Sequence, residues 1–444
     1  MLLKRGTRRE SVSMLVAAAL TALSLTGCAV GRETGPDRLS RDRVTIRLNW
    51  WGAEERQKLT ADAVRLFEKK HPRIHVRMEY SDWTGYWDRL ATMSAAGDPP
   101  DVIQMDALYL SAYADRGALL DLGKSKFLDR GRLPAKLLGT GRYEGKLYAV
   151  PNAVTAPGLA VNTTLLDKLG LKLPDTKSWT WSEYEVFAAK VNRVSGGKVA
   201  GALPLAGSSA LELFARQRGD RLFSDDGHIV LRPETLTAFW NGADRLIKSE
   251  ATLSRSQLAD AAVLPLDQSP LATGKAATSV IFASQLAAYA AASGGDEFIL
   301  VDLPSGEKGE QAVDSGQFIK PAMYWSISAQ TRHPAESALL VNFLTGDMQT
   351  AKILGAERGL PAVPAVRAQV AGSLSSEDRR AAEFVESIEN KAEGPALAIA
   401  PTGANDVEAS LTRYGQEVMF GRVSAKDAAR AFIKEMADKI YSAG

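Results

Sequence analysis

The stretch TIRLNWWGAEERQKL, residues 45–59, contains the pattern that decides the fold. Val44, Ile46 and Leu48 alternate with polar residues, which predicts a strand with one buried face. Two tryptophans and Gly52 end this strand, and two glutamates then fall at the N-terminal end of a helix, where negative charge is favourable. We therefore expect a strand, a glycine turn and a helix in direct succession.

The alternation of strand and helix continues along the next fifty residues. Apolar residues at helical spacing cover residues 59–67, and strand-like alternation covers residues 74–80. A second helical pattern covers residues 86–93, and a short apolar strand lies within PPDVIQMD, residues 99–106. This order of elements indicates an α/β fold with a largely parallel sheet.

Ligands of such sheets bind beyond the carboxyl ends of the strands. Three strand ends carry aromatic or acidic residues, namely Trp50 and Trp51, the segment 80–83, and Asp106. We expect these ends to meet on one rim, with the tryptophan pair at the binding edge, outside the core. Two alternatives remain, because Trp50 continues the buried face of its strand and Asp106 could only cap the next helix.

Composition narrows the class of protein. Hydrophobic residues make up 45% and charged residues 24% of 444 residues, as in an ordinary globular protein. The 54 basic and 52 acidic residues give no basic excess that would suggest a nucleic-acid partner. A chain of this length exceeds one core, so we expect two lobes. The sequence holds no zinc-protease, Walker A or nucleophile-elbow motif, and we expect no metal, cofactor or catalysis.

The start of the chain predicts export and a lipid anchor. A basic segment, residues 4–10, precedes an uncharged and mostly apolar run, residues 11–27, and then Cys28, the only cysteine. This pattern resembles a bacterial lipobox. We expect a signal peptide over residues 1–27, a lipidated Cys28, a flexible tether over residues 28–43, and an extracytoplasmic protein that the lipid alone holds at the cell membrane. The arginine pair leaves the export route open between Sec and twin-arginine, and a stray signal-peptide cysteine is the alternative for Cys28.

Further segments carry a family resemblance. They are YSDWTGYWDRL (80–90), GDPPDVIQMD (97–106), GRYEGKLYAVPN (141–152), LATGKAATSVIF (271–282), PAMYWSIS (321–328) and SALLVNFLTG (337–346). In this order, over about residues 44–440, they resemble the family 1 extracellular solute-binding proteins of ABC sugar importers. The resemblance implies a periplasmic-binding-protein-like fold, in which hinge strands join two α/β lobes and the ligand binds between them.

The same resemblance implies the lobe boundaries and the function. The chain would cross between lobes near residues 152, 321 and 363, which gives an N-terminal lobe of 44–152 and 322–362 and a C-terminal lobe of 153–321 and 363–444. The protein would be a monomer that binds a mono- or oligosaccharide and delivers it to the permease subunits of an ABC importer. The alternatives are a binding protein for a peptide, polyamine or metal chelate and, less favoured, a secreted carbohydrate-active enzyme.

Sugar binding needs aromatic rings for the apolar faces of the sugar and polar groups for its hydroxyls, because unpaired polar groups are costly. The candidates are the rings of Trp50, Trp51, Trp83, Tyr86, Tyr324 and Trp325, and the polar side chains of Arg56, Asp106, Asn152, Ser208, Gln285 and Arg358. Each also has a structural interpretation, such as core packing for Trp50 or a solvated charge for Arg56. Either arginine could also bind the carboxylate of a uronide.

Two further features concern the second lobe. Many family members carry Gly-Pro-Trp after the GKAAM-like strand, whereas FASQL here places Ser284 and Gln285 in that position. The stacking ring of that lobe would then be lost or supplied elsewhere. Trp179 and Trp181 are expected to be structural, beside a helix start for which Ser182 is the candidate cap.

Overall fold

The computed structural model describes residues 38–52, 54–306, 315–391 and 397–443, so the predicted signal peptide, Cys28 and most of the tether lie outside the described residues. The last tether residues, 38–43, are described. There the backbone N–H of Ser40 donates a hydrogen bond to Glu336 Oε1 at 2.5 Å, so this end of the tether contacts the folded body.

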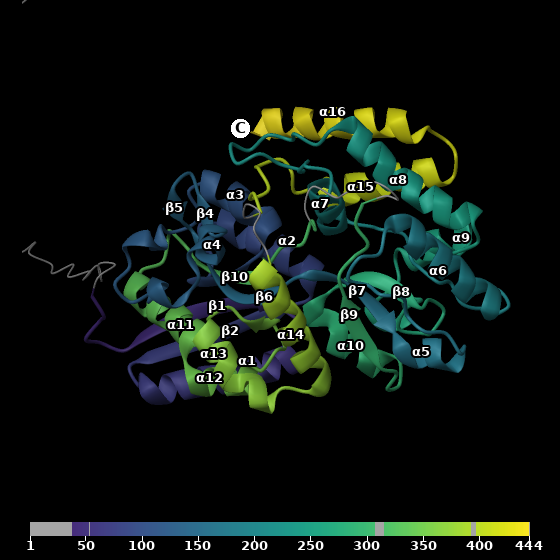
Figure 1. Cartoon of the computed structure of the whole chain (residues 1–444). Coiled ribbons are helices and arrows are strands. Elements are labelled where there is room, and N and C mark those ends of the chain that lie inside the picture. The colour runs from purple at the N-terminus through teal and green to yellow at the C-terminus, as the bar shows by residue number, and fades with distance from the viewer. Residues whose placement is uncertain (1–37, 53, 307–314, 392–396, 444) are drawn as a thin grey trace, which may run out of the picture. The chain divides into compact units, whose positions relative to one another are not determined.

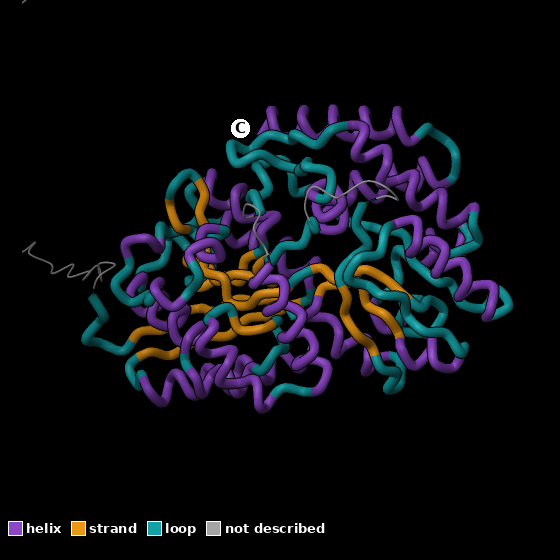
Figure 2. The backbone as a smooth tube through the Cα atoms, in the orientation of Figure 1, coloured by secondary structure: helices purple, strands orange, loops and turns teal. Residues whose placement is uncertain are grey.

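Within the described residues, the larger sheet has six strands in the order β11-β6-β10-β3-β1-β2 (Figures 1 and 2). Its strands are β1 (Val44–Trp51), β2 (Ile74–Ser81), β3 (Val102–Met105), β6 (Ala149–Thr155), β10 (Lys320–Ile327) and β11 (Leu360–Pro361). The first three strands are parallel, as the sequence predicts, whereas β10 runs antiparallel to both of its neighbours.

A smaller, antiparallel sheet has the order β8-β7-β9, formed by β7 (Pro157–Asn162), β8 (Thr278–Phe282) and β9 (Phe298–Val301). The chain passes from the larger sheet to the smaller one at Ala156, between β6 and β7. It returns to the larger sheet through β10. A separate two-stranded hairpin consists of β4 (Arg142–Tyr143) and β5 (Lys146–Leu147).

Helices cover both sheets (Figure 1). They are α1 (Glu54–Lys70), α2 (Trp83–Ala95), α3 (Ala107–Asp115), α4 (Ala135–Gly139), α5 (Thr163–Lys168), α6 (Trp181–Val194), α7 (Ser208–Arg216), α8 (Pro233–Lys248), α9 (Arg255–Ala261), α10 (Leu286–Ala292), α11 (Pro334–Gly346), α12 (Met348–Leu354), α13 (Pro364–Val370), α14 (Ser376–Lys391), α15 (Val407–Met419) and α16 (Ala425–Ala443). α13 packs on α12 and β11, α14 packs on α10 and β9, and α16 packs on α8 and α15. None of these helices combines the length and the apolar character needed to cross a bilayer.

Side chains at the helix starts explain where the helices near the rim begin. Asp82 and Asp106 are the N-caps of α2 and α3, and each accepts a hydrogen bond from a backbone N–H of the first turn. At α6 the cap is Thr180, which forms a capping box with Glu183, so the expectation that Ser182 caps this helix is wrong. The prediction that Trp179 and Trp181 are buried is confirmed.

The two faces of the larger sheet bury different side chains. Ile46, Leu48 and Trp50 belong to the main hydrophobic core. Trp51 points to the other face, into a second, aromatic-rich core that includes Tyr86 and Trp87. Both tryptophans are therefore core residues, and the expectation that the pair stands outside the core is wrong.

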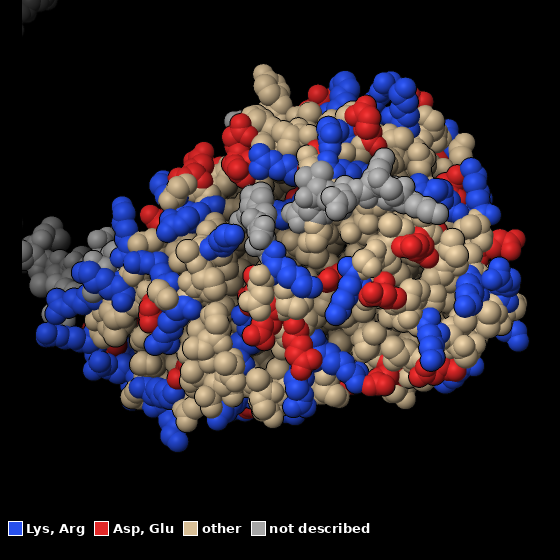
Figure 3. Space-filling view, viewed as in Figure 1, with Lys and Arg blue, Asp and Glu red and all other residues tan. Residues whose placement is uncertain are grey.

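The surface carries charges of both signs. On the face shown in Figure 3, Lys and Arg side chains lie among Asp and Glu side chains over much of the described surface. This mixture agrees with the nearly equal numbers of basic and acidic residues in the sequence.

Candidate functional site

The strand ends converge on one rim, as the sequence predicts. Trp51 lies opposite Ser81 in the parallel pair of β1 and β2, and Met105 ends β3 opposite Tyr324 of β10. Because β10 runs antiparallel, it begins at this same rim with Lys320. The rim thus collects the carboxyl ends of three strands and the amino end of a fourth.

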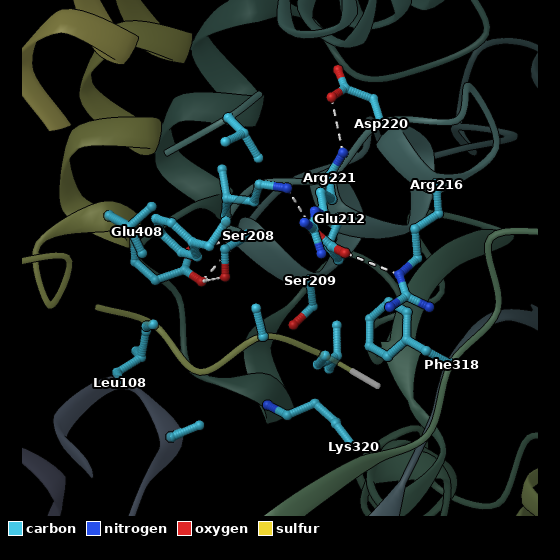
Figure 4. Close-up of a pocket in the computed structure, with 18 of the residues that line it drawn as sticks. Leu108, Ser208, Ser209, Glu212, Arg216, Asp220, Arg221, Phe318, Lys320 and Glu408 are labelled. Atoms are coloured by element: carbon cyan, nitrogen blue, oxygen red, sulfur yellow. Dashed lines mark hydrogen bonds and ion pairs between the residues drawn. The ribbon is translucent and has the colours of Figure 1, made fainter. Parts of the chain in front are cut away.

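A cavity of about 810 Å³ opens above the rim. From the larger sheet it is lined by Trp83, by residues 106–108 and by Lys320; the remaining lining consists of Ser208, Ser209, Glu212, Arg216, residues 219–223, Val230, Arg232, Phe282, Phe318, Leu397, Ala398, Ala400, Val407 and Glu408. A volume of this size is typical of binding sites for small organic ligands. Figure 4 shows the side chains of α7 and of the loop after it facing Lys320 and Leu108.

Trp83 is the exposed tryptophan of the rim, with 41% of its surface accessible. Trp51 packs edge-on against it at 5.0 Å between ring centroids and also contacts Tyr86 at 5.2 Å and Trp87 at 5.7 Å. These contacts leave Trp51 only 9% exposed. The expectation of an exposed ring at Trp51 is therefore wrong, because rings from α2 cover it, and Trp83 is the ring that faces the cavity.

Asp106 combines the two interpretations that the sequence left open. Its Oδ1 accepts a hydrogen bond from the backbone N–H of Leu108 at 2.9 Å, so it caps α3. The same residue lines the cavity, and its Oδ2 has no hydrogen-bond partner among the described residues. A carboxylate held by one oxygen can offer the other to a hydroxyl group of a ligand.

On the opposite side, α7 presents a row of polar groups to the cavity. The backbone N–H of Ser208 donates to Glu408 on α15 at 3.1 and 3.2 Å, and the Ser208 hydroxyl also bonds to Glu408. One turn further, Glu212 Oε1 accepts from Arg216 Nε at 2.9 Å and Glu212 Oε2 from the N–H of Leu222 at 2.8 Å. These bonds fix the side chains in place before any ligand binds.

Two phenylalanines supply apolar surface on this side. Phe282 ends β8, and Lys320 Nζ lies 4.7 Å from the centre of its ring. Phe318 lies beneath the guanidinium of Arg216 at 5.3 Å. The sequence analysis missed both rings. The strand-end rule that found Trp83 could have found Phe282, whereas Phe318 stands in a connection that has no periodic signal.

Two arginines expected as ligand contacts are held by the protein itself. Arg56 Nε lies 2.7 and 2.9 Å from the two carboxylate oxygens of Glu357, and its Nη1 donates to the carbonyl oxygen of Trp51 at 3.0 Å. Gly52 makes room for this arrangement, since a Cβ there would lie 2.4 Å from Arg56 Cδ. Neither Arg56 nor Arg358 lines the cavity that the described residues form.

Arg358 is buried beneath the rim. It donates to Thr60 Oγ1 at 2.6 Å and to Gln104 Oε1 at 3.3 Å. Burial, with the nearby charge of Arg56, lowers the pKa of Arg358 to about 9, which still leaves its guanidinium protonated at neutral pH. This residue therefore acts in the packing beneath the site.

The remaining aromatic candidates also lie outside the cavity lining. Trp50 is fully buried and stacks on Tyr80 at 5.8 Å. The hydroxyl of Tyr86 donates to the carbonyl oxygen of Gln104 at 2.5 Å, and burial raises the pKa of Tyr86 well above its usual value. Tyr324 and Trp325 are both buried, and the Tyr324 hydroxyl donates to the carbonyl oxygen of Thr140 at 3.2 Å.

The two amide candidates do not reach the cavity lining either. Gln285 accepts a hydrogen bond from the backbone N–H of Phe282 at 2.9 Å and so stabilises the turn after β8. Asn152 lies in the middle of β6, where its side-chain amide is buried and has no hydrogen-bond partner within the described part of the chain. Of the predicted contacts, the structure brings together Trp83, Asp106 and Ser208.

Among the described residues, no three His, Cys, Asp or Glu side chains lie close enough together to hold a metal ion. The chemistry of the cavity is therefore that of its aromatic rings, hydroxyls and charged groups. Such a set can cover the apolar face of a ligand and satisfy hydroxyl groups around its edge.

Known proteins share this fold. A structure of an extracellular solute-binding protein family 1 from Alicyclobacillus acidocaldarius is 26% identical, covers 90% of this chain and 99% of its own, and has a TM-score of 0.69. A periplasmic oligogalacturonide binding protein from Yersinia enterocolitica, solved with saturated digalacturonic acid, is 25% identical with a TM-score of 0.76 and covers 90% and 100% of the two chains. The predicted periplasmic-binding-protein-like fold of two α/β lobes is thereby confirmed.

Sequence comparison gives the same family. The multiple sugar-binding protein of Streptococcus mutans is 25% identical over 177 residues, 39% of each chain. The chain spans about two-fifths of the length of the curated relatives that it matches. The sequence model of the family described as "Bacterial extracellular solute-binding protein" matches residues 62–383. The chain belongs to this family of bacterial extracellular solute-binding proteins.

Proposed function

We propose that this protein binds an oligosaccharide outside the cytoplasm and delivers it to the permease subunits of an ABC importer. The observation that carries the proposal is the cavity, because aromatic rings line it on two sides, Trp83 on one and Phe282 with Phe318 on the other, while polar groups stand between them. Rings on both sides can cover both apolar faces of a sugar.

Two comparisons support the sugar as ligand class. The Yersinia protein is named for binding an oligogalacturonide, and the Streptococcus protein is named for binding multiple sugars. The lining gives no preference for a polyamine, since basic and acidic side chains are present in equal number. We therefore keep the sugar as the one candidate.

The proposal includes the way the protein works. Two lobes would close on the ligand, and the closed form would be the one that the permease recognises. Sheet membership supports lobe crossings at Ala156 and between β9 and β10, close to the expected boundaries at 152/153 and 321/322. For the third crossing we propose residues 371–375 in place of residue 363, since α13 packs with β11 and α14 packs with β9.

The proposal also includes the anchor and the absence of turnover. Cys28 would carry a lipid that tethers a monomer to the outer face of the cell membrane. The mutation Cys28→Ser should then move the protein from the membrane fraction to the soluble fraction with unchanged ligand affinity. A variant that stays with the membrane through a high-salt wash would argue against the anchor.

The decisive experiment measures binding directly. The protein without its first 37 residues is titrated calorimetrically with a panel of neutral and acidic α- and β-linked oligosaccharides, and with peptides and polyamines as controls. We expect at least one oligosaccharide to bind, to raise the melting temperature and to be recovered unchanged. Binding of a peptide or polyamine alone, or cleavage of a sugar, would overturn the proposed function.

A further inference from the structure

The charges that line the cavity are formally balanced but unequally compensated. Four basic and four acidic side chains line it. Two of the acids are paired with neighbouring cations. Arg216 Nε lies 2.9 Å from Glu212, and Arg232 Nε lies 3.2 Å from Asp220. These pairs use their charges within the protein and leave little for a ligand.

The other two acids are compensated by helix ends. Asp106 accepts the N–H of Leu108 at the start of α3, and Glu408 accepts the N–H and the hydroxyl of Ser208 at the start of α7. The amino end of a helix carries unsatisfied N–H groups and partial positive charge, which stabilise a carboxylate there. Each cavity carboxylate therefore has a donor inside the protein.

Lys320 differs from all of these groups. Among the described residues, no carboxylate lies within ion-pair distance of its Nζ. The contact observed is the ring face of Phe282 at 4.7 Å. The side chain is partly buried, lines the cavity and extends toward the space between Leu108 and Ser209 (Figure 4). The cavity lining has one other cation without a partner in the lining, Arg221, whose carboxylate partner Asp225 lies outside the lining at 3.4 Å.

We propose that the ligand is an oligosaccharide bearing an anionic group, a uronate carboxylate or a sulfate ester, and that Lys320 binds this group. The inference rests on the proposed function, which it narrows to acidic sugars. A cation removed in part from water gains most from a charged acceptor, since charge-assisted hydrogen bonds are the stronger ones. The ring of Phe282 holds the ammonium in position but does not neutralise it.

The position of Lys320 adds a consequence for lobe closure. Lys320 is the first residue of β10 and lies opposite Thr155 at the end of β6, next to the point where the chain leaves the larger sheet. The hydroxyl of Thr155 also accepts the N–H of Ser284, which follows β8 of the smaller sheet. An anionic group bound at Lys320 would therefore contact the strand that connects the two sheets.

The test uses matched pairs of ligands. Digalacturonic acid is compared with its carboxyl-reduced disaccharide, and a sulfated disaccharide with its desulfated form, by calorimetry at low and high NaCl. We expect an acidic member to bind at least about tenfold more tightly than its neutral partner, the range of a hydrogen bond to a charged group. Its affinity should fall as salt is added.

Three variants assign that preference to Lys320. Lys320→Met keeps the apolar stem over Phe282 and should weaken the acidic sugar about 10- to 100-fold, with an affinity for the neutral partner within about threefold of the wild type. Lys320→Arg should restore most of the loss. The control is Lys168→Met on α5, a lysine outside the lining that pairs with Asp296 at 3.1 Å and should change neither affinity.

The outcomes separate the two levels of the proposal. An acidic sugar that binds equally well to Lys320→Met, or a variant that loses acidic and neutral sugars alike, overturns the role of Lys320. Neutral members that bind while no acidic member does overturn the anionic ligand and leave the proposed function standing. Failure of every sugar, with folding confirmed by circular dichroism, would instead count against the proposed function itself.

Discussion

The two walls of the cavity are built on different principles. The wall at the ends of β1, β2 and β3 consists of rings, in which Trp83 leans on Trp51 and Trp87 at 5.0 and 5.5 Å. The wall formed by α7 and the start of α15 consists of hydrogen-bonded charges, with Glu212 tied to Arg216 and Glu408 tied to Ser208. Ring packing depends little on pH and salt, whereas the charged wall should respond to both.

The largest expected effect comes from removing the buried ring of the first wall. Trp51→Ala deletes a side chain that is 9% exposed and packed among three other rings. It should lower the free energy of unfolding by about 3–5 kcal/mol, the usual cost of truncating a core tryptophan. Urea denaturation followed by circular dichroism measures this loss.

The more conservative Trp51→Phe serves as its control and should recover much of the stability, since it keeps one ring in the cluster. A Trp51→Ala protein with wild-type stability would show that this wall does not depend on the packing of its rings.

The second effect concerns ligand affinity. Trp83 is 41% exposed, so Trp83→Ala should cost about 1 kcal/mol or less of stability. A sugar that covers on the order of 50–80 Å² of this ring would gain roughly 1–2 kcal/mol, so affinity should fall about 5- to 30-fold. Calorimetry with the best ligand of the panel measures the change.

Trp51 and Trp83 thus form a matched pair in one cluster, one ring acting on stability and the other on affinity. If Trp83→Ala binds as tightly as the wild type, the ligand does not stack on this wall. If Trp83→Ala unfolds as readily as Trp51→Ala, the two rings are parts of one core and the distinction between them fails.

The first wall could be predicted from the sequence because it depends on local order. A strand followed by a helix fixes where each strand ends, and this rule found Trp83 and Asp106. It misjudged the exposure of Trp51, since that depends on Trp87 and Tyr86, which α2 brings over the strand end. Burial at a strand end is thus decided by the next helix, which periodicity does not position.

The second wall could not be predicted in the same way. Glu408 meets Ser208 across 200 positions of sequence, and Lys320 meets Phe282 only because β10 and β8 end close together. No local pattern encodes such pairs. Ser208 itself was proposed from the family resemblance alone, and the two arginines proposed as ligand contacts are used up by Glu357, Thr60 and Gln104.

The smallest expected effect is a pH dependence of the charged wall. α15, which carries Glu408, is held on α16 by Glu435, whose carboxylate accepts hydrogen bonds from Ser410 at 2.8 Å and Arg413 at 2.5 Å. Burial alone would raise the pKa of Glu435, but these and neighbouring donors outweigh burial and lower the pKa to about 2 from the usual 4.5. The folded protein therefore favours the charged form of this group.

The sign of the effect follows from this lowered pKa. The contribution of Glu435 is fully present above pH 4.5 and is lost as the pH falls from about 4.5 toward 2, because the unfolded chain takes up the proton first. Glu435→Gln should lower stability at pH 7 and flatten the fall below pH 4.5, by a slope of at most one proton. Trp51→Ala, in the wall of rings, should instead shift the whole stability curve down by a similar amount at every pH. Urea denaturation of the three proteins between pH 7 and pH 3 makes the comparison. Parallel curves for Glu435→Gln and the wild type would mean that this carboxylate does not hold the charged wall together.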